Sequence, residues 1–495
     1  MILAFIVGSI LISIVIIALT PRENSMKLRQ RALEWSLITF ALSILLLVNF
    51  HQEAQFQQII EFNWISTMGW FEGSPILFAI DGISIFFIVL STLLTPICIL
   101  VSWNSIKFLV KEFIICLLGM ELLLIGVFST LDLLIFYVLF ESILIPMFLI
   151  IGVWGARAEK IKAAYYFFFY TLVGSILMLL SIAVIYRITG TTDYLSLTNI
   201  QIDSNIQIWL FMGFFLSLAV KVPMMPFHIW LPLAHVEAPL AGSVILAGIL
   251  LKLGGYGFIR FAWPLFPEAT EYLAPIILTL SLIAVIYGSL TTCRQVDAKR
   301  LIAYSSVAHM GIVTIGLFTH TMEGLIASIF LMIAHGVVSP ALFIAVTLLY
   351  ERHHTRLIRY YRGVVMTMPL FSIIFMVFTL ANIAIPLSCN FVGEFLSLVA
   401  AFSTSTSLGI LTSTSMVIAA AYSLYLYNRI CFGQLSPYLI FSRDINRREF
   451  NGQLPLIVAI LLLGVVPYPL IELIRVCVCV YLDLIIVVGA GVEPA

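Results

Sequence analysis

The most constraining feature of this sequence is a series of apolar runs, each about twenty residues long. A helix of that length crosses the roughly 30 Å of hydrocarbon in a bilayer. Only 10% of the residues are charged and 62% are hydrophobic, so a water-soluble fold of 495 residues would lack the polar side chains to cover its core. Apolar and polar residues do not alternate along the runs, which excludes a membrane β-barrel. The chain is therefore predicted to be an all-α integral membrane protein.

The runs predict fourteen transmembrane helices. They cover residues 2–20, 33–50, 76–102, 112–129, 131–154, 164–187, 206–232, 239–262, 272–292, 300–318, 325–350, 368–402, 410–432 and 453–474. The seventh and twelfth spans are long and are interrupted by proline. A further apolar tail, 476–490, is too short to count as a span.

Basic side chains test this count independently, because Lys and Arg gather in the loops on one side of a membrane. Of the 25 basic residues, 20 fall in the loops that follow odd-numbered spans. Arg187, Arg260 and Arg475 are assigned to the opposite side, and Lys221 and Lys252 fall within spans. A miscounted span would scramble this alternation, so we expect both termini on the outer, positive side of the membrane.

The sequence offers no motif for a redox cofactor, a nucleotide or a metal. Its seven cysteines are scattered, without a CxxC pair, an iron–sulfur spacing or a Cys/His zinc spacing. Neither a dinucleotide-binding glycine motif nor a phosphate-binding P-loop occurs. A formal net charge of zero argues against nucleic-acid binding, which needs a basic face. We therefore expect no cofactor, metal site or nucleic-acid partner for this chain.

Four ionisable residues fall near the middle of predicted spans: Glu141, Lys221, Lys252 and Glu394. Each costs at least about 2.5–3.5 kcal/mol to insert at that depth, so each needs a partner or a function. One interpretation is a structural ion pair between Glu141 and a lysine, which is weak evidence for stability because desolvation offsets the attraction. The alternative is a proton relay, in which a nearby carboxylate decides whether a lysine holds or releases its proton.

Both interrupted spans carry one of these charges beside the interruption. Pro223 and Pro226 follow Lys221, and Pro386 precedes Glu394. Proline removes a backbone hydrogen bond, and broken helices at corresponding positions of two halves point to an ion pathway. The two breaks correspond if spans four to eight and nine to thirteen are five-helix repeats, the second inverted because five is odd. This divides the chain into an N-terminal three-helix segment (1–110), two repeats (111–264 and 265–435) and a C-terminal span with its tail (436–495).

Histidines can carry protons between such charges because they titrate near neutrality. His309 and His335 lie inside the tenth and eleventh spans and are candidates for the relay. His228 and His235 flank the first break. For His235 we favour a structural role, in which its ring satisfies a backbone carbonyl that the prolines have freed.

Three further acids are expected to be structural. Asp132 begins a span, where a carboxylate caps the helix and suits its dipole. Asp81 and Glu121 lie in or near spans, and we favour structural roles for both.

Four long stretches carry a family resemblance: VKVPMMPFHIWLPLAHVEAP, AGSVILAGILLKLGGYG, RLIAYSSVAHMG and NFVGEF. From about residue 75 to 475, the sequence resembles the proton-pumping antiporter-like subunits of respiratory complex I. Within that family, the chain 5 type and the related multi-subunit sodium/proton antiporters typically carry lysine where this chain has Glu394. The stretches DGISIFFIVL, FYVLFESILIPMFLIIGVWG and HVEAP are similar to mitochondrial, plant-like members rather than bacterial ones.

The resemblance implies a role for each buried charge. Glu141 would modulate Lys221, and Lys252 would connect two half-channels through His309 and His335. Glu394 would exchange protons with the outer side. One departure is that many relatives have glycines in the second break, as N-x-G-x-P-G, where this chain has Ala384 and Leu387. The departure argues against a mechanism that requires a glycine hinge there.

The resemblance also implies an assembly. The chain would be a proton-translocating subunit in the membrane arm of NADH:ubiquinone reductase, without a redox site of its own. FMN, iron–sulfur clusters and ubiquinone would be bound by partner subunits, and its neighbours would include the chain 5 and chain 2 types as well as lipids. It would be a multi-pass protein of the mitochondrial inner membrane, with both termini facing the intermembrane space.

Three rival functions remain open from the sequence. A subunit of a multi-subunit sodium/proton antiporter would use the same buried charges. An inert membrane scaffold would hold them as structural ion pairs. A substrate transporter would need a solute-sized cavity at a break, and the four charges lie too far apart along the chain to suggest one pocket.

Overall fold

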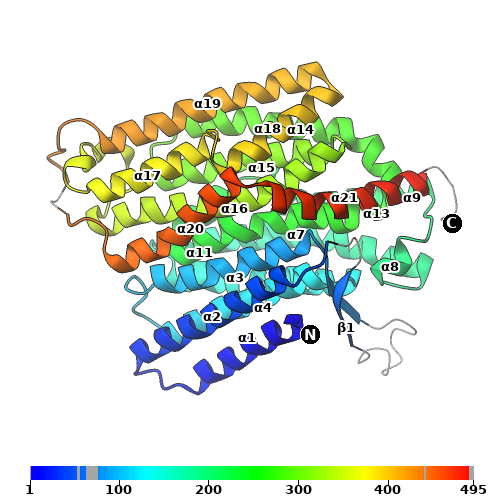
Figure 1. Ribbon diagram of the computed structural model, residues 1–495, viewed down its shortest axis with the longest axis horizontal. Coiled ribbons are helices and arrows are strands. Elements are labelled where there is room, and N and C mark those ends of the chain that lie inside the picture. The colour runs from blue at the N-terminus through cyan, green and yellow to red at the C-terminus, as the bar shows by residue number, and fades with distance from the viewer. Residues whose placement is uncertain (1, 53–55, 63–75, 440–441, 490–495) are drawn as a thin grey trace.

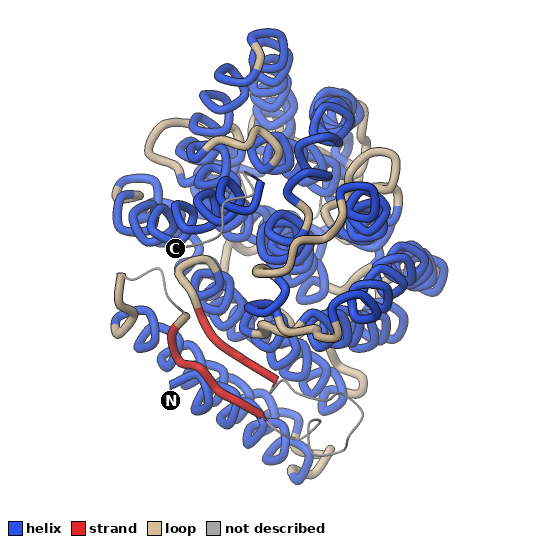
Figure 2. Tube along the Cα trace, turned by 90° about the vertical axis from the view of Figure 1, so that its right-hand side faces the viewer, coloured by secondary structure: helices blue, strands red, loops and turns tan. Residues whose placement is uncertain are grey.

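The computed structural model describes residues 2–52, 56–62, 76–439 and 442–489, most of which form helices that run side by side (Figure 1). Within this described part, thirteen helical stretches are long and apolar enough to cross a membrane. Viewed from one end, the same helices form a closely packed bundle (Figure 2). The predicted helical membrane fold is confirmed at this level.

The first four long helices lie at one edge of the bundle (Figure 1). They are α1 (Ile2–Leu19), α2 (Ser25–Val48), α3 (Ser84–Val101) and α4 (Val110–Ser129). Between α2 and α3, the chain forms a short antiparallel sheet of β1 (Gln57–Phe62) and β2 (Ile76–Ile80). Ile60 pairs with Phe78 in this sheet. The all-α prediction missed the sheet, because its strands are too short to stand out beside the apolar spans.

The middle of the chain contains several interrupted spans. The helices of this region are α5 (Leu133–Ser142), α6 (Leu144–Trp154), α7 (Lys160–Thr189), α8 (Tyr194–Leu197), α9 (Ser204–Lys221), α10 (Trp230–Glu237), α11 (Leu240–Ile245), α12 (Leu251–Gly257) and α13 (Trp263–Leu265). Of these, α7 is continuous over 30 residues and α8 is a single short turn. Two π-helical segments, η2 (Leu246–Leu250) and η3 (Phe258–Ala262), flank α12. These π turns were not predicted, and such turns are often found at functional sites.

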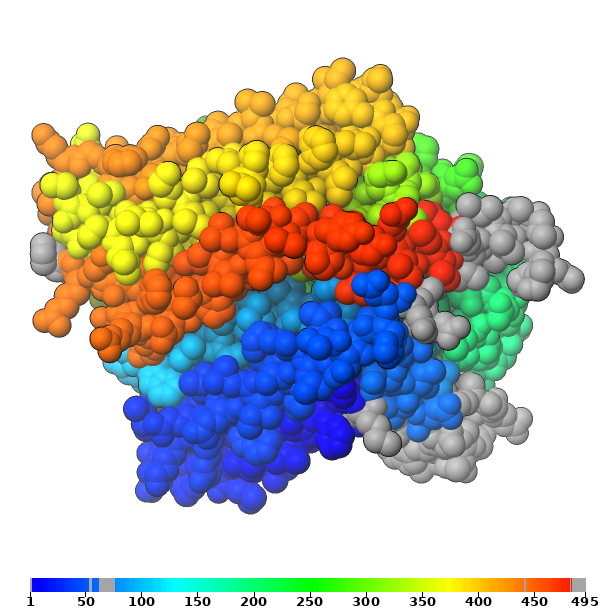
Figure 3. All heavy atoms as spheres, in the orientation of Figure 1, coloured from blue at the N-terminus to red at the C-terminus, as the bar shows by residue number. Residues whose placement is uncertain are grey.

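The remaining helices include α15 and α16, which are largely buried, and others that lie at the opposite edge and on one face. They are α14 (Pro267–Cys293), α15 (Ala298–Leu317), α16 (Met322–His353), α17 (Pro369–Asn382), α18 (Cys389–Thr404), α19 (Thr406–Cys431), α20 (Arg447–Val465) and α21 (Tyr468–Gly489), with short 3₁₀ turns η4 (Ile358–Tyr360) and η5 (Val364–Met366). Helices α20 and α21 form a band across the face shown in Figure 3, between the N-terminal helices and α17–α18.

The C-terminal prediction needs correction. The expected span 453–474 is interrupted between Val465 and Tyr468. Pro467 has no backbone N–H to donate to the preceding turn, so the helix ends before it. The expected short tail is not separate from this span. Its residues 476–489 belong to α21, and residues 490–495 lie outside the described part.

The two ends of the bundle differ in chemistry. At one end, called the hairpin end, the Ile2 amide of α1 donates to Gln58 of β1, and the Gly82 amide after β2 donates to Cys477 of α21. At the other end, called the basic end, Arg22 pairs with Glu112 at 2.6 Å. There the predicted basic loops also contact one another: the Ala298 amide donates to the Arg356 carbonyl, and Arg352 pairs with Glu449.

Arg260 departs from the charge count. It was assigned to a loop, yet it lies in η3, is 2% exposed, and pairs with Asp81 at 2.7 Å. A charge near a span end cannot be placed inside or outside a bundle by counting alone.

The centre of the molecule lies where α11–α13 pass α16. The most apolar parts of Leu240–Leu265 and Met322–His353 are fully buried, whereas only a third or less of the corresponding parts of α1 and α20 is buried. Any polar side chain on α12 or the middle of α16 is therefore shielded from lipid on all sides by protein.

Candidate functional site

The first predicted break lies directly after Lys221. Helix α9 ends at Lys221, and α10 resumes at Trp230 beyond Pro223 and Pro226. The Trp230 indole donates to the Val220 carbonyl at 2.9 Å, which satisfies an acceptor that the helix end leaves free. The break therefore holds a lysine at a helix end inside the membrane-spanning region.

Lys221 faces α5 across this break. Its side chain is 4% exposed, its Nζ lies 4.0 Å from the centre of the Phe140 ring, and it donates to the Phe140 carbonyl at 3.4 Å. The ring face stabilises the ammonium by a cation–π interaction.

Glu141 follows Phe140 and interacts electrostatically with Lys221. Both of its carboxylate oxygens are buried, and the Ser175 side chain lies near enough to interact with the carboxylate. The contact ion pair that a purely structural interpretation required does not form in the described part.

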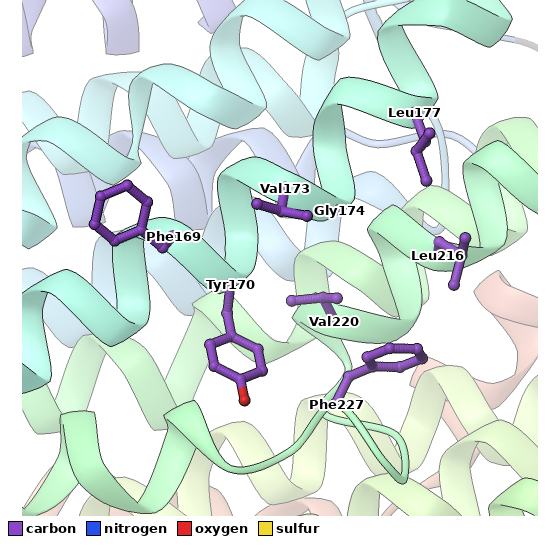
Figure 4. A pocket seen from close by; sticks show the side chains of 8 residues that line it. All are labelled: Phe169, Tyr170, Val173, Gly174, Leu177, Leu216, Val220 and Phe227. Carbon is purple, nitrogen blue, oxygen red and sulfur yellow. The ribbon is translucent and has the colours of Figure 1, made fainter.

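An apolar cavity of about 450 Å³ lies beside the same break, between α7 and α9 (Figure 4). Tyr170, Val220 and Phe227 are among the residues that line it, and no charged side chain does. Val173 in its lining is 64% exposed, so the cavity opens to the outside of the bundle. A solute-sized space thus exists at a break, but its lining does not suit a polar solute.

Lys252 lies at the centre of the molecule, on α12 between the two π-helical segments. It is 0% exposed. Its Nζ donates to the Ala247 carbonyl in η2 and lies 2.8 Å from His335 Nδ1 on α16. The lysine is therefore held by one backbone carbonyl and by one ring that can accept or return a proton.

Two histidines extend this contact toward the second break. The His335 and His309 rings lie 5.7 Å apart, centre to centre, and His309 Nδ1 lies 2.8 Å from Glu394 Oε1. The His309–Glu394 approach is that of an ion pair, although the two groups are not aligned as a hydrogen bond. Lys252, His335, His309 and Glu394, from α12, α16, α15 and α18, form what we call the buried row. Each of its members is at most 2% exposed.

The second predicted break lies just before Glu394 in the chain. Helix α17 ends at Asn382, whose side-chain amide donates to Ser423 at 3.0 Å, and α18 starts at Cys389. Between them, Ala384 and Leu387 have φ of 61° and 75°. These residues adopt the left-handed backbone that glycine favours, at a cost of about 1–2 kcal/mol per residue, so the break forms without a glycine at either position.

Lys221 and the buried row have no direct contact, but their helices touch. A Cβ at Gly254 would lie 2.5 Å from Val222 Cγ2 and 2.8 Å from the Leu218 carbonyl oxygen. The absence of a side chain thus lets α12 pack against the end of α9. Five of the six predicted site residues are buried and Glu141 is half-buried, and the structure brings four of the six into one row.

The hydrogen bond expected from His235 to a freed backbone carbonyl does not form in the described part, although the ring is packed in the core. Both of its ring nitrogens are buried without a hydrogen-bond partner in the described part, and the ring stacks on Phe343 at 4.5 Å. The carbonyls at the end of α10 are satisfied by other groups: Arg356 donates to Val236 at 2.6 Å and Lys299 to Ala238 at 2.8 Å. The position of His235 beside a broken helix predicts free carbonyls nearby. It does not predict that arginine and lysine side chains from distant parts of the chain bind them.

The three acids expected to be structural have structural contacts. Asp132 caps α5 by accepting from the Ile135 amide at 2.9 Å. Asp81 accepts from the Ser84 amide at the start of α3, besides its pair with Arg260. Glu121 accepts from the Thr39 hydroxyl at 3.0 Å. Among the described residues, no group of three or more His, Cys, Asp or Glu side chains is placed to hold a metal ion.

Comparison with known proteins places the chain in a family. The family described as NADH:quinone oxidoreductase/Mrp antiporter, TM, matches residues 130–419. NADH-ubiquinone oxidoreductase chain 4 of Metridium senile is 64% identical over 453 residues, which cover 91% of this chain and 92% of that protein. The chain 4 protein of Arabidopsis thaliana is 53% identical over 455 residues, which cover 92% and 91%. The chain belongs to the NADH–ubiquinone oxidoreductase chain 4 family. The sequence resemblance to a mitochondrial, plant-like complex I subunit, and specifically to the chain 4 type, is thereby confirmed.

Solved structures agree with membership in the chain 4 family. A chain of respiratory complex I from Thermus thermophilus with bound NADH has a TM-score of 0.88 at 29% identity, covering 97% of this chain and 99% of that one. A chain of the Mrp complex from Dietzia sp. DQ12-45-1b has a TM-score of 0.87 at 19% identity, covering 99% and 98%. The second likeness concerns the fold alone.

Proposed function

We propose that this chain translocates protons across the mitochondrial inner membrane as a membrane-arm subunit of NADH:ubiquinone oxidoreductase. The buried row carries this proposal, because it joins an amine, two imidazoles and a carboxylate within the core. Isolated charges at that depth are expensive, and chains of Lys, His and Glu inside membranes commonly mark proton relays. Membership of the chain 4 family supports the same function.

Each relay residue has a separate task in this proposal. Glu141 tunes Lys221 through its electrostatic interaction, so a change in the carboxylate's charge or position makes the lysine hold or release its proton. Lys252 passes protons to His335 over a 2.8 Å contact, and His309 passes them to Glu394. Glu394 then exchanges with the outer side. Neighbouring groups this close titrate as a unit rather than one by one.

We further propose fourteen spans, with α17 and α18 as the two halves of the twelfth. Two inverted five-helix repeats (111–264 and 265–435) follow the N-terminal segment (1–110), and the last span with its tail (436–495) ends the chain. Asp132 and Asp297 support the repeats: each caps the second span of its unit and bridges the loop after the next span. Asp132 lies next to Thr130, which bridges to β2, whereas Asp297 is at the basic end, so the two units point in opposite directions.

The electron chemistry belongs, in this proposal, to other subunits. FMN, iron–sulfur clusters and ubiquinone are bound by partners, and this chain has no redox site of its own. Its neighbours in the membrane arm include the chain 5 and chain 2 types, together with lipids, and nucleic acid is not a partner. Both termini face the intermembrane space, since the basic loops belong on the negative side.

The test uses the intact complex in sealed vesicles. Lys252→Met and Glu394→Gln should assemble normally, yet NADH-driven proton transport, followed with a pH-sensitive dye, should fall about tenfold or more, because a proton-transfer group is lost. Lys107→Met, which removes an exposed lysine, serves as the matched control and should transport normally. Normal transport by both row variants in assembled complexes would contradict the relay and favour the inert-scaffold alternative.

The chief alternative is a subunit of a sodium/proton antiporter, which the fold shared with the Mrp complex keeps in view. It is the weaker alternative because the relatives at 53–64% identity are complex I subunits. The same vesicles separate the two functions. Sodium added without NADH should leave the internal pH unchanged, whereas sodium-driven proton movement that Glu394→Gln abolishes would favour the antiporter.

A further inference from the structure

Two cavities lie along one seam of the bundle, where α7 packs against α9 and α10. The first is the apolar cavity of about 450 Å³ beside the first break (Figure 4). The second has a volume of about 380 Å³, lies at the basic end and has a polar lining. The residues of α7 that line the two cavities are three or four positions apart, so they form one stripe along the helix. They are Lys162 and Tyr166 in the polar cavity and Tyr170, Val173, Gly174 and Leu177 in the apolar one.

Aromatic rings join the two cavities. The Tyr166 ring stacks on the Tyr170 ring, with the ring centres 6.1 Å apart and the planes 19° from parallel. Lys162 Nζ lies 5.8 Å from the centre of the Tyr166 ring. On the opposite wall, Phe227 lines the apolar cavity and Ile229, two positions later, lines the polar one. The seam is therefore continuous from charged side chains at the basic end to apolar side chains at the first break.

The seam has the depth of one leaflet of a bilayer. Lys162 and Val173 are eleven residues apart on the continuous helix α7, which corresponds to about 16 Å at 1.5 Å per residue. Half of the hydrocarbon core is about 15 Å. Val173 and Ile229 are both exposed, so each cavity opens to the outside of the bundle. A lipid whose headgroup lies at the basic end can therefore place an acyl chain in the apolar cavity.

The polar cavity has charged groups of both signs that lack a partner. Arg157, Lys162 and Arg300 line it and take part in no ion pair within the described part. Glu237 also lines it and is 4% exposed, and its buried Oε2 has no hydrogen-bond partner among the described residues. Lys299 interacts electrostatically with this carboxylate, but its Nζ donates to a backbone carbonyl. The cavity therefore suits a ligand that carries both an anionic acceptor and a cationic donor.

Two further acids make a purely anionic ligand less suitable. Asp297 is already engaged, because it accepts from backbone amides at the start of α15. Glu159 is exposed at the start of α7. An anion without a positive group would face these two carboxylates and Glu237, and it would leave Oε2 of Glu237 unbonded.

We propose that this seam binds one phospholipid with an ethanolamine headgroup. Its phosphate accepts from Arg157, Lys162 and Arg300, because basic side chains form strong charge-assisted hydrogen bonds with phosphate. Its ammonium donates to Oε2 of Glu237, and one acyl chain fills the apolar cavity. A choline headgroup has no N–H to donate, since its nitrogen carries three methyl groups. The inference goes beyond the proposed function, because it concerns a bound lipid and not proton transfer.

The test locates the lipid by photochemical labelling. The intact complex is reconstituted in phosphatidylcholine vesicles with a trace of a phospholipid that carries a diazirine in its acyl chain. Three probes are compared, with ethanolamine, choline or glycerol headgroups, and labelled peptides of this chain are identified by mass spectrometry. The ethanolamine probe should label residues 169–177 about tenfold more than either other probe, because a hydrogen bond to a charged group is worth at least that factor.

A second apolar cavity of this chain is the internal control. It has a volume of about 390 Å³, lies between α1 and α4, and has no charged side chain among the described residues that line it. Labelling there should be the same for all three headgroups.

Glu237→Gln keeps the size of the side chain and removes its charge. It should reduce labelling by the ethanolamine probe to the level of the choline probe and leave the control cavity unchanged. Should this buried variant assemble poorly, Lys162→Met, at an exposed position, decides instead by lowering ethanolamine labelling severalfold. Lys107→Met, which also removes an exposed lysine, is its matched control and should be labelled normally.

Three results would overturn the proposal. Equal labelling of residues 169–177 by all probes would mean that any acyl chain enters the cavity. A preference for the glycerol probe would mean an anionic lipid. Labelling of the control cavity alone would mean that a partner subunit covers the seam. None of these results depends on proton transport, so the proposed function is tested separately.

Discussion

At the residue scale, the pair between Arg260 and Asp81 shows how a buried charge becomes structural. The two groups are 2.7 Å apart and at most 3% exposed, and Arg260 also donates to the Tyr256 hydroxyl. Removal of one partner leaves a buried charge without compensation, which costs about 3–5 kcal/mol. We expect Arg260→Gln to lower the thermal stability of the solubilised complex and the fraction of chain that assembles, as seen on native gels.

The double variant Asp81→Asn/Arg260→Gln is the check on this prediction. Because it leaves two neutral groups that can still hydrogen-bond, it should recover a large part of the lost stability. A double variant as unstable as the sum of the single variants would mean that the two charges are not coupled.

The same scale shows where sequence reasoning ends. The cost of a charge in the membrane was enough to single out Lys252 and Glu394, because almost any polar group at that depth needs a reason. It could not show that His335 contacts Lys252, since that contact joins residues 83 positions apart on different helices. For Arg260 and His235, the sequence identifies a polar residue in or near a span, but it does not predict which residues contact it.

At the scale of helices, the approach of α16 to η2 positions the buried row. A Cβ at Gly336 would lie 2.9 Å from the Gly248 carbonyl oxygen and 2.6 Å from a Leu90 methyl, so even alanine must push the two segments apart. His335 is the preceding residue and contacts Lys252 across this crossing. Gly336→Ala should therefore lower stability by about 1–3 kcal/mol and weaken proton transport together.

Gly119→Ala on α4 is the matched control for this prediction. No atom lies within 4 Å of its added Cβ, and alanine is the better helix former by roughly 1 kcal/mol. It should leave thermal stability unchanged or slightly raised and transport normal. If Gly336→Ala behaves in the same way, the close crossing does not set the geometry of the row.

Helix positions and breaks were largely predictable, and finer distortions were not. Apolar run length located the spans, and proline beside a charge located both breaks, because each signal acts within a few residues. The π turns around Lys252 have no comparable signal, and the interruption before Tyr468 was overlooked although Pro467 and Pro469 mark it. Ala384 and Leu387 show that a left-handed backbone can form without glycine, which the residue types alone do not predict.

At the scale of the whole molecule, the clustering of basic loops could be predicted because charge sidedness is a global rule with a simple count. The meeting of α12, α15, α16 and α18 in one core could not, because it depends on how the helices pack against one another. The difference between the two ends of the bundle nevertheless follows from the count of basic residues in the loops. Helix α1 begins at the hairpin end and α21 passes it, opposite the basic loops.

This polarity predicts the sidedness of the chain in its membrane. Cys293 is exposed at the end of α14, beside the basic loops, so a membrane-impermeant maleimide should label it in inside-out vesicles and not in right-side-out mitoplasts. A cysteine introduced as Asn199→Cys, exposed after α8 toward the hairpin end, should show the opposite pattern. Labelling of the detergent-solubilised complex gives the maximum for each cysteine. A cysteine that stays unlabelled there is covered by a partner subunit and reports nothing about its side of the membrane. The fourteen-span topology places an odd number of crossings between residues 199 and 293, so the two cysteines should lie on opposite sides. Labelling of both from the same side would contradict this topology and the placement of both termini in the intermembrane space.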